Sequence, residues 1–292
     1  MTASRGVRRR PRLVRGPVTI GEPGPEIEVR LAGTEPYRPD SIADGGTAFG
    51  LTIRAASIRG LAKRYAGGPR QDDLCLAVHE DTGTVVVAVA DGVSAAERSD
   101  LGAALAVRYA TAAVVRQLDR RAQALEWGEV FEQAAWSLVE EHRRYSGDPE
   151  AGVEAASDRL ATTLLVAAIA GGRAQVAFVG DSPAFLLADG GFEPVAGDAV
   201  APDQLLGGGI QALPRTPDAV RSAECALRPG SVLLMCTDGV SLPLADGTGE
   251  VGQALARELR RPPDIVDFAR LVDFSRSTYD DDRSLVAVWP QA

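Results

Sequence analysis

Short apolar runs, separated by polar turns, recur along most of the chain after residue 50. Residues 84–90 are uncharged and apolar or β-branched throughout, which is typical of a strand that is buried on both faces. Other runs of this kind predict strands at residues 51–58, 73–79, 162–170, 174–180, 183–188, 231–237 and 285–289. Several neighbouring runs are joined by hairpin-sized turns, such as residues 80–83, so the pattern favours antiparallel pairing.

Helical periodicity occurs in pairs of consecutive stretches. Residues 101–115 place apolar side chains on one face after the potential capping pair Ser99-Asp100, and a second helix is expected over residues 128–145. A further pair is predicted near residues 251–260 and 264–274. Strands in hairpin groups and helices in pairs predict an α+β fold with antiparallel sheets, rather than an alternation of βαβ units.

Three segments lack sustained periodicity. Residues 1–49 are rich in Arg, Pro and Gly, which predicts a largely disordered N-terminal extension, followed by one domain over residues 50–292. Residues 146–159 and 194–226 are predicted to be loops. In the second, Gly207-Gly208-Gly209 indicates a mobile flap, because no Lys-Ser/Thr pair follows to complete a phosphate-binding P-loop.

Composition excludes some classes of function. A net charge of −9 argues against a general binder of nucleic acid or of an anionic membrane. Lysine is almost absent. Cys75, Cys225 and Cys236 have no metal-binding spacing, and two of them lie inside apolar runs as small hydrophobic residues. The N-terminus lacks the apolar segment of a signal peptide and no run is long enough to span a membrane, so we expect a cytoplasmic protein.

Acidic residues stand at the ends of several predicted strands. They are Asp91-Gly92, Asp181-Ser182, Asp238-Gly239 and Asp280-Asp281-Asp282. Any one of them alone is most simply a turn, because Asp and Gly both favour turns. Four in one chain converge if their strands share a core, and clustered carboxylates repel one another unless they are protonated or a cation lies among them. Oxygen ligands without His or Cys suit Mg²⁺ or Mn²⁺.

The order of these motifs resembles that of the metal-dependent serine/threonine protein phosphatases (the PPM, or type 2C, family), particularly bacterial members. The matching residues are Asp91-Gly92, Ala177-Phe178-Val179-Gly180-Asp181-Ser182, Thr237-Asp238-Gly239 and Asp280-Asp281-Asp282-Arg283-Ser284. The resemblance extends from about residue 54 to residue 289. It implies a four-layer α-β-β-α sandwich, in which two antiparallel sheets are flanked by helix pairs. It also implies hydrolysis of phosphoserine and phosphothreonine on proteins by a hydroxide that bridges metal ions.

The resemblance further implies two or three Mn²⁺ or Mg²⁺ ions and a set of residues that bind them. Asp91 would bridge two ions, and Asp72 stands where the family holds metal-bound water. The remaining metal-binding residues would be Gly92, through its carbonyl group, with Asp181, Asp238 and Asp281.

The chain departs from the family pattern in two motifs. Residues 91–95 read Asp-Gly-Val-Ser-Ala where the family has Asp-Gly-x-Gly-Gly, and Ser and Ala disfavour a positive φ. Residues 280–282 read Asp-Asp-Asp where the family has Asp-Asp-Asn. The first departure predicts a reshaped turn after Asp91.

A third departure concerns the cation that binds the substrate phosphate. The family arginine is absent, because its position is occupied by Gly68. Arg70 is the first substitute, since alternate residues of an extended segment lie on one face and Asp72 follows two positions later. A solvated surface role for Arg70 is an equal alternative, and Arg64 and Lys63 are the next candidates.

Two other functions are compatible with the same residues. One is a pseudophosphatase that keeps the fold as a binding module, and the other is a two-metal hydrolase of small phosphate esters. As a phosphatase, the protein is expected to be a monomer in signal transduction, with phosphoproteins of a Ser/Thr kinase as its partners and neither nucleic acid nor membrane.

Overall fold

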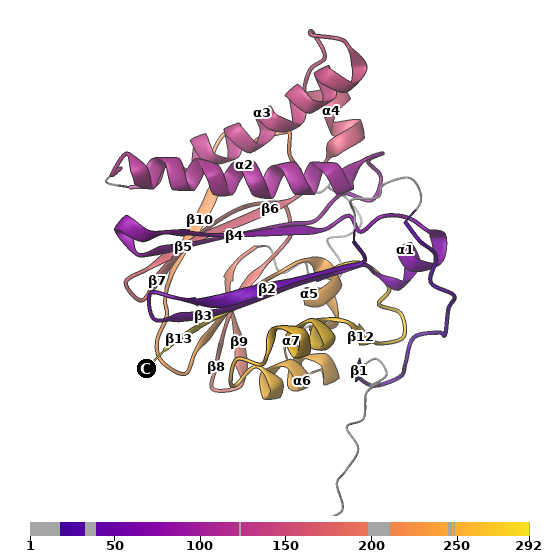
Figure 1. Cartoon of the computed structure of the whole chain (residues 1–292), viewed down its shortest axis with the longest axis vertical. Helices are drawn as coiled ribbons and strands as arrows, with labels where there is room; N and C mark the ends of the chain where they lie inside the picture. Colours follow the sequence, from indigo (N-terminus) through magenta and orange to yellow (C-terminus); the bar gives the residue numbers. More distant parts are fainter. Residues whose placement is uncertain are drawn as a thin grey trace, which may run out of the picture.

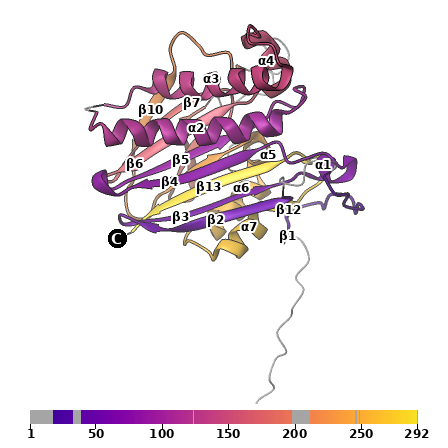
Figure 2. The same ribbon diagram turned by 45° about the horizontal axis from the view of Figure 1, so that its top comes forward.

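Two antiparallel sheets lie face to face at the centre of the molecule, and helices cover both outer faces (Figure 1). The computed structural model describes residues 18–32, 39–122, 124–197, 211–244, 247 and 249–291. The four layers follow in the order helix, sheet, sheet, helix, as the turned view in Figure 2 also shows. The predicted α-β-β-α sandwich is therefore confirmed.

The first sheet has five strands in the order β10-β7-β6-β5-β4. Their bounds are β4 Asp73–His79, β5 Thr84–Ala90, β6 Leu164–Ala170, β7 Arg173–Val179 and β10 Arg221–Ala226. The short helix η1, Glu80–Thr82, joins β4 to β5. The outer face of this sheet is covered by α2 Ser99–Asp119, α3 Trp127–Ser146 and α4 Val153–Leu160.

The second sheet has six strands in the order β2-β3-β13-β11-β8-β9. Their bounds are β2 Ser41–Ala48, β3 Leu51–Ile58, β8 Ala184–Ala188, β9 Gly191–Ala196, β11 Val232–Cys236 and β13 Arg283–Pro290. Its outer face is covered by α5 Asp238–Leu244, α6 Glu250–Glu258 and α7 Ile265–Val272. Helix α1, Leu61–Ala66, lies at one end of the sheets, and β1 Val18–Thr19 pairs in parallel with β12 Phe274–Ser275.

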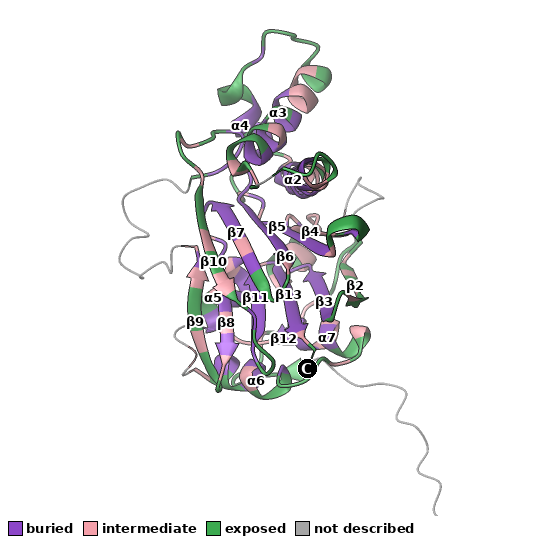
Figure 3. Ribbon diagram, turned by 90° about the vertical axis from the view of Figure 1, so that its left-hand side faces the viewer, coloured by how far each residue is buried: buried purple, intermediate pink, exposed green. Residues whose placement is uncertain are grey.

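The central strands are buried on both faces, as their composition predicts (Figure 3). Along β5, Val85, Val87 and Val89 pack into the core between the sheets. Val86 and Ala88 point the other way and pack under α2 and α3. This alternation explains why β5 has no polar face, since successive side chains point to opposite sides of a sheet.

Four expectations from the sequence are corrected by the structure. Residues 41–48 form the edge strand β2, so the folded domain begins before residue 50. The predicted loops at 146–159 and 194–226 contain α4 and the edge strand β10. Both strands are exposed on one side and α4 is only eight residues long, so none of these elements has a strong apolar pattern. Helix α5, which begins at Asp238, was not expected.

Some predictions fall outside the described residues. Residues 1–17 and 33–38 of the predicted N-terminal extension belong to this part of the chain, as does the predicted flap with Gly207-Gly208-Gly209. Within the described ranges, none of the helices combines the length and the apolar character needed to cross a membrane.

Candidate metal centre

Neighbouring strands end at one edge of the sandwich and carry the predicted acidic residues there. Strand β4 begins directly after Asp72, and β5, which pairs with it in register, ends directly before Asp91. In the second sheet β11 ends two residues before Asp238, and its neighbour β13 begins directly after Asp282. Antiparallel pairing thus collects acidic residues that are far apart in the sequence.

The acidic side chains of both sheets converge on Asp91. Burial raises the pKa of Asp91 well above its usual value, and the charges of Asp72, Asp238, Asp281 and Asp181 raise it further. Every acidic residue that the resemblance assigns to the metal site therefore lies within electrostatic range of Asp91.

Asp238 is the best-defined member of this cluster. Burial and the neighbouring charge of Asp281 raise its pKa to about 6, while a hydrogen bond with the side chain of Asp91 opposes the rise. A hydrogen bond between two carboxyl groups requires a proton on one of them, because an ionised carboxylate can only accept. The side chains of Asp91 and Asp238 therefore lie within hydrogen-bonding distance of each other.

The acidic residues divide into an accessible group and a buried group. Asp91, Asp181, Asp238 and Asp281 are partly exposed. Asp72 and Asp282 are only 1% and 2% exposed. The accessible group can reach a cation or a substrate from solvent, whereas the buried group braces the loops behind it.

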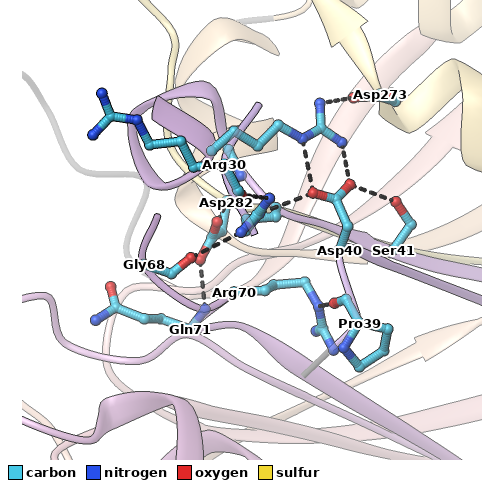
Figure 4. A network of polar contacts seen from close by, with 12 residues as sticks. Arg30, Pro39, Asp40, Ser41, Gly68, Arg70, Gln71, Asp273 and Asp282 are labelled. Atoms are coloured by element: carbon cyan, nitrogen blue, oxygen red, sulfur yellow. Dashed lines mark hydrogen bonds and ion pairs between the residues drawn. The ribbon is translucent and has the colours of Figure 1, made fainter. Parts of the chain in front are cut away.

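The buried carboxylates hold the loops together through hydrogen bonds. Asp72 accepts bonds from the hydroxyl groups of Thr237, at 2.7 Å, and Ser284, at 2.9 Å, and so links the two sheets. Asp282 accepts hydrogen bonds from the backbone N–H groups of Gly60, at 2.7 Å, and Gln71, at 2.6 Å (Figure 4). The sequence signalled both acids, but it did not signal that these two are braces.

The loop that contains Asp91 is fixed by two threonines that no sequence motif marks. The carbonyl group of Asp91 accepts hydrogen bonds from Thr163 N–H and Thr162 Oγ1, both at 2.8 Å. Gly92 packs closely behind it, because a Cβ atom there would lie 2.7 Å from the carbonyl oxygen of Gln71. Two threonines before an apolar run are too common to mark a site from sequence alone.

The turn after Asp91 tolerates the residues that depart from the family pattern. Ala96 N–H donates to the carbonyl oxygen of Val93 at 2.9 Å, which closes a tight turn. Neither Ser94 nor Ala95 adopts a positive φ in this turn. A glycine is therefore not required at either position.

The chemistry of the donor atoms fits hard divalent cations, but the side chains are not arranged in a coordination geometry. Within the described residues, no three His, Cys, Asp or Glu side chains are arranged to hold a metal ion. The accessible donors are all carboxylates, which Mg²⁺ and Mn²⁺ prefer. Burial is the largest cause of the raised pKa values of Asp91 and Asp238, and repulsion from the neighbouring carboxylates raises them further. A cation among the carboxylates would remove that repulsion.

The structure gives no support to the prediction that Arg70 binds the substrate phosphate. Its side chain is 1% exposed and lies inside the protein. Its Nη1 donates to Ser57 Oγ at 2.6 Å and to the carbonyl oxygen of Asp72, and it lies 3.7 Å from the Asp73 carboxylate. The spacing argument placed Arg70 beside Asp72 correctly, but it could not show that the guanidinium group turns inward.

The fold and the acidic site together define a phosphatase of the metal-dependent class. The family model described as protein phosphatase 2C matches residues 59–278, which is more than half of the chain. The protein therefore belongs to the protein phosphatase 2C family. No curated protein sequence matches the chain.

Solved structures with the same fold are distant in sequence. The Mycobacterium tuberculosis serine/threonine phosphatase PstP/Ppp has a TM-score of 0.55 and 18% identity, over 83% of this chain and 99% of that one. A structure of the PstP catalytic domain with two manganese ions has a TM-score of 0.55, 19% identity and the same coverage. PppA, a regulatory component of type VI secretion in Pseudomonas aeruginosa, has a TM-score of 0.53 and 18% identity, over 84% and 99%.

Family membership establishes the general activity. The protein is a metal-dependent hydrolase that removes phosphate from serine and threonine in phosphoproteins, and it depends on divalent cations.

Proposed function

We propose that Asp91, Asp181, Asp238 and Asp281 bind the divalent cations of this phosphatase, together with the carbonyl group of Gly92. The convergence of these carboxylates on Asp91 at the ends of strands from both sheets carries the proposal. The preferred ions are Mn²⁺ or Mg²⁺, because the donors are oxygen atoms without His or Cys. When bound, such ions act as Lewis acids and lower the pKa of water.

The protein itself supplies positions and charge. Asp91 stands at the centre of the cluster, where it can contact more than one ion. Asp72 holds the ends of β4, β11 and β13 together through Thr237 and Ser284. This brace keeps the accessible carboxylates at fixed distances from one another, which a reaction that depends on orientation requires.

The substrates are phosphoproteins modified by a Ser/Thr kinase, and the protein acts as a monomer in cytoplasmic signal transduction. The family supports the substrate class. The partly exposed site supports access by a peptide segment, since its four accessible carboxylates are not covered by the described residues.

The pseudophosphatase alternative is disfavoured, because every acidic residue expected in the site is present and grouped around Asp91. A hydrolase of small phosphate esters differs from the proposal only in substrate. Phosphopeptides and a small ester therefore belong in the same experiment.

The test is hydrolysis of a phosphothreonine peptide and of p-nitrophenyl phosphate, with Mn²⁺, with Mg²⁺ and with excess EDTA. We expect turnover with metal, none with EDTA, and a higher kcat/KM for the peptide. Asp238→Asn should lower kcat by about 100-fold or more, on the scale of losing a metal or electrostatic group. The exposed control Asp218→Asn should retain full activity. Full turnover in EDTA, or no turnover with any metal, would refute the proposal.

A further inference from the structure

Lys63 is the only lysine in a chain with 31 basic residues. It lies in α1, and its side chain is half-buried. Among the described residues, no hydrogen-bond or ion-pair partner holds its ammonium group. An unpaired cation beside a group of carboxylates is unusual, because such cations ordinarily form ion pairs.

Helix α1 is attached directly to the acidic loop of the metal centre. Gly60 N–H, at its N-cap, donates to Asp282, and Ala62 N–H donates to the carbonyl oxygen of Asp280 at 3.0 Å. A Cβ atom at Gly60 would lie 2.2 Å from the carbonyl carbon of Asp281, so only glycine permits this contact. Lys63 therefore lies about one helical turn after Gly60, which contacts the loop that contains Asp281.

The positive charge of Lys63 acts on the acidic loop of the metal centre. The Lys63 ammonium lies within electrostatic range of the Asp282 carboxylate. The stem of Lys63 also runs beside Gly68, since a Cβ atom at Gly68 would lie 3.8 Å from Lys63 Cδ. The side chain therefore lies beside the position at which the chain lacks an arginine.

The other cations near α1 are already engaged. Arg59 and Arg64 both bind Asp40, with nitrogen–oxygen distances of 2.8 and 2.6 Å. Arg70 is buried against backbone and side-chain oxygens. Of the four described cations Arg59, Lys63, Arg64 and Arg70, only Lys63 can bind a ligand without breaking an existing contact.

The same ion pairs fix the orientation of α1. Arg64 forms a second ion pair with Asp273 at 3.0 Å, and its carbonyl oxygen accepts Arg30 N–H at 2.9 Å. Arg30 also stacks over the ring of Tyr65 at 5.4 Å. Both faces of the short helix are therefore anchored, which limits the region that the Lys63 ammonium can reach.

We propose that Lys63 binds the phosphate group of the substrate, in place of the arginine that the chain lacks. This inference rests on the proposed site, because a dianionic phosphate can approach clustered carboxylates only when positive charge offsets the repulsion. Lysine serves here as a point charge, whereas an arginine in the same place would form paired bonds with the carboxylates, as Arg64 does with Asp40.

The kinetic test compares Lys63→Ala, Lys63→Arg and the exposed control Arg257→Ala on p-nitrophenyl phosphate with Mn²⁺. Lys63→Ala should raise KM, and the inhibition constant of inorganic phosphate, by about tenfold or more, the value of one charge-assisted contact. Its kcat should change by less than about threefold, because ground state and transition state both carry the phosphate. Lys63→Arg should recover part of the loss, and Arg257→Ala should match the parent.

A second readout does not depend on turnover. An acetylating reagent can modify only one ε-amino group in this chain, with the amino terminus as an internal reference. Inorganic phosphate with Mn²⁺ should slow acetylation of Lys63 at least about threefold, which mass spectrometry of the peptide measures, while the amino terminus reacts at an unchanged rate.

The two readouts separate the possible failures. If the parent is active but Lys63→Ala keeps its KM and phosphate does not protect Lys63, the assignment of Lys63 is overturned and the proposed function stands. If the parent hydrolyses nothing, the proposed function is overturned. The acetylation experiment then decides whether Lys63 binds phosphate.

Discussion

Replacing Asp238 by asparagine should make the metal-free protein more stable, although it removes a catalytic group. The side chain is partly exposed, and burial followed by the charge of Asp281 raises its pKa from 3.8 to about 6. Each pKa unit corresponds to about 1.4 kcal/mol, so ionised Asp238 destabilises the folded protein by at most about 3 kcal/mol at neutral pH. Asparagine has the same size and can still form a hydrogen bond with Asp91.

The gain in stability must depend on pH. Because the folded-state pKa of Asp238 is raised, the folded protein binds its proton more tightly than the unfolded chain does. The penalty is therefore complete above pH 6, fades between pH 6 and 4, and is absent below the unfolded value. Asp238→Asn should exceed the parent in free energy of unfolding by about 1–3 kcal/mol at pH 8, and the difference should be small at pH 4.5.

The assay is urea unfolding in EDTA at several pH values, with Asp218→Asn as an exposed control that should match the parent. Mn²⁺ should then stabilise the parent more than Asp238→Asn, because a ligand that binds only the folded state stabilises it by mass action. A variant that is less stable than the parent at pH 8, or a gain that is the same at every pH, would show that like-charge repulsion does not dominate at this position.

Three further predictions concern residues outside the carboxylate cluster. Replacing Cys75, Cys225 and Cys236 together by alanine should leave kcat within about threefold of the parent, since burial raises the pKa of each thiol and metal-assisted hydrolysis uses no thiolate; a folded but inactive variant would contradict this. Arg70→Met should lower the free energy of unfolding by about 3 kcal/mol or more, measured in urea, and leave the KM of the folded protein unchanged, because the guanidinium is buried and bonded to oxygens. Asp40→Asn should raise KM more than it lowers kcat, because it releases the ion pairs that orient α1; an unchanged KM would show that α1 is held without them.

The sequence predicted the parts of the fold that are buried on two sides. Strand β5 has no polar face because it lies between two cores, and that pattern identifies it as a strand from the sequence. The edge strands β2 and β10 and the short helix α4 expose one side, so their patterns are weak. Burial on both faces, rather than distance from the site, therefore decided which elements were predictable.

The same contrast applies to the site. The acids were predictable because each follows or precedes a buried strand, and antiparallel pairing brings such ends together. The direction of a long side chain is decided by tertiary contacts instead. Arg70 turns inward because Ser57 Oγ and the carbonyl oxygen of Asp72 offer acceptors there, whereas no acceptor within the described part of the chain holds Lys63. No spacing rule distinguishes these two outcomes.

The third residue of the Asp280-Asp281-Asp282 run shows how one departure from the family pattern is accommodated. Both oxygen atoms of Asp282 accept backbone N–H groups, one from Gly60 and one from Gln71. An asparagine in the same position would direct its NH₂ group at one of these donors, because an amide has only one acceptor oxygen. The extra negative charge of the aspartate is offset by the two N–H groups and by Lys63, which oppose the effect of burial on its pKa. Asp282 and Lys63 are therefore coupled through α1, and removing the charge of either residue should change the electrostatic environment of the other.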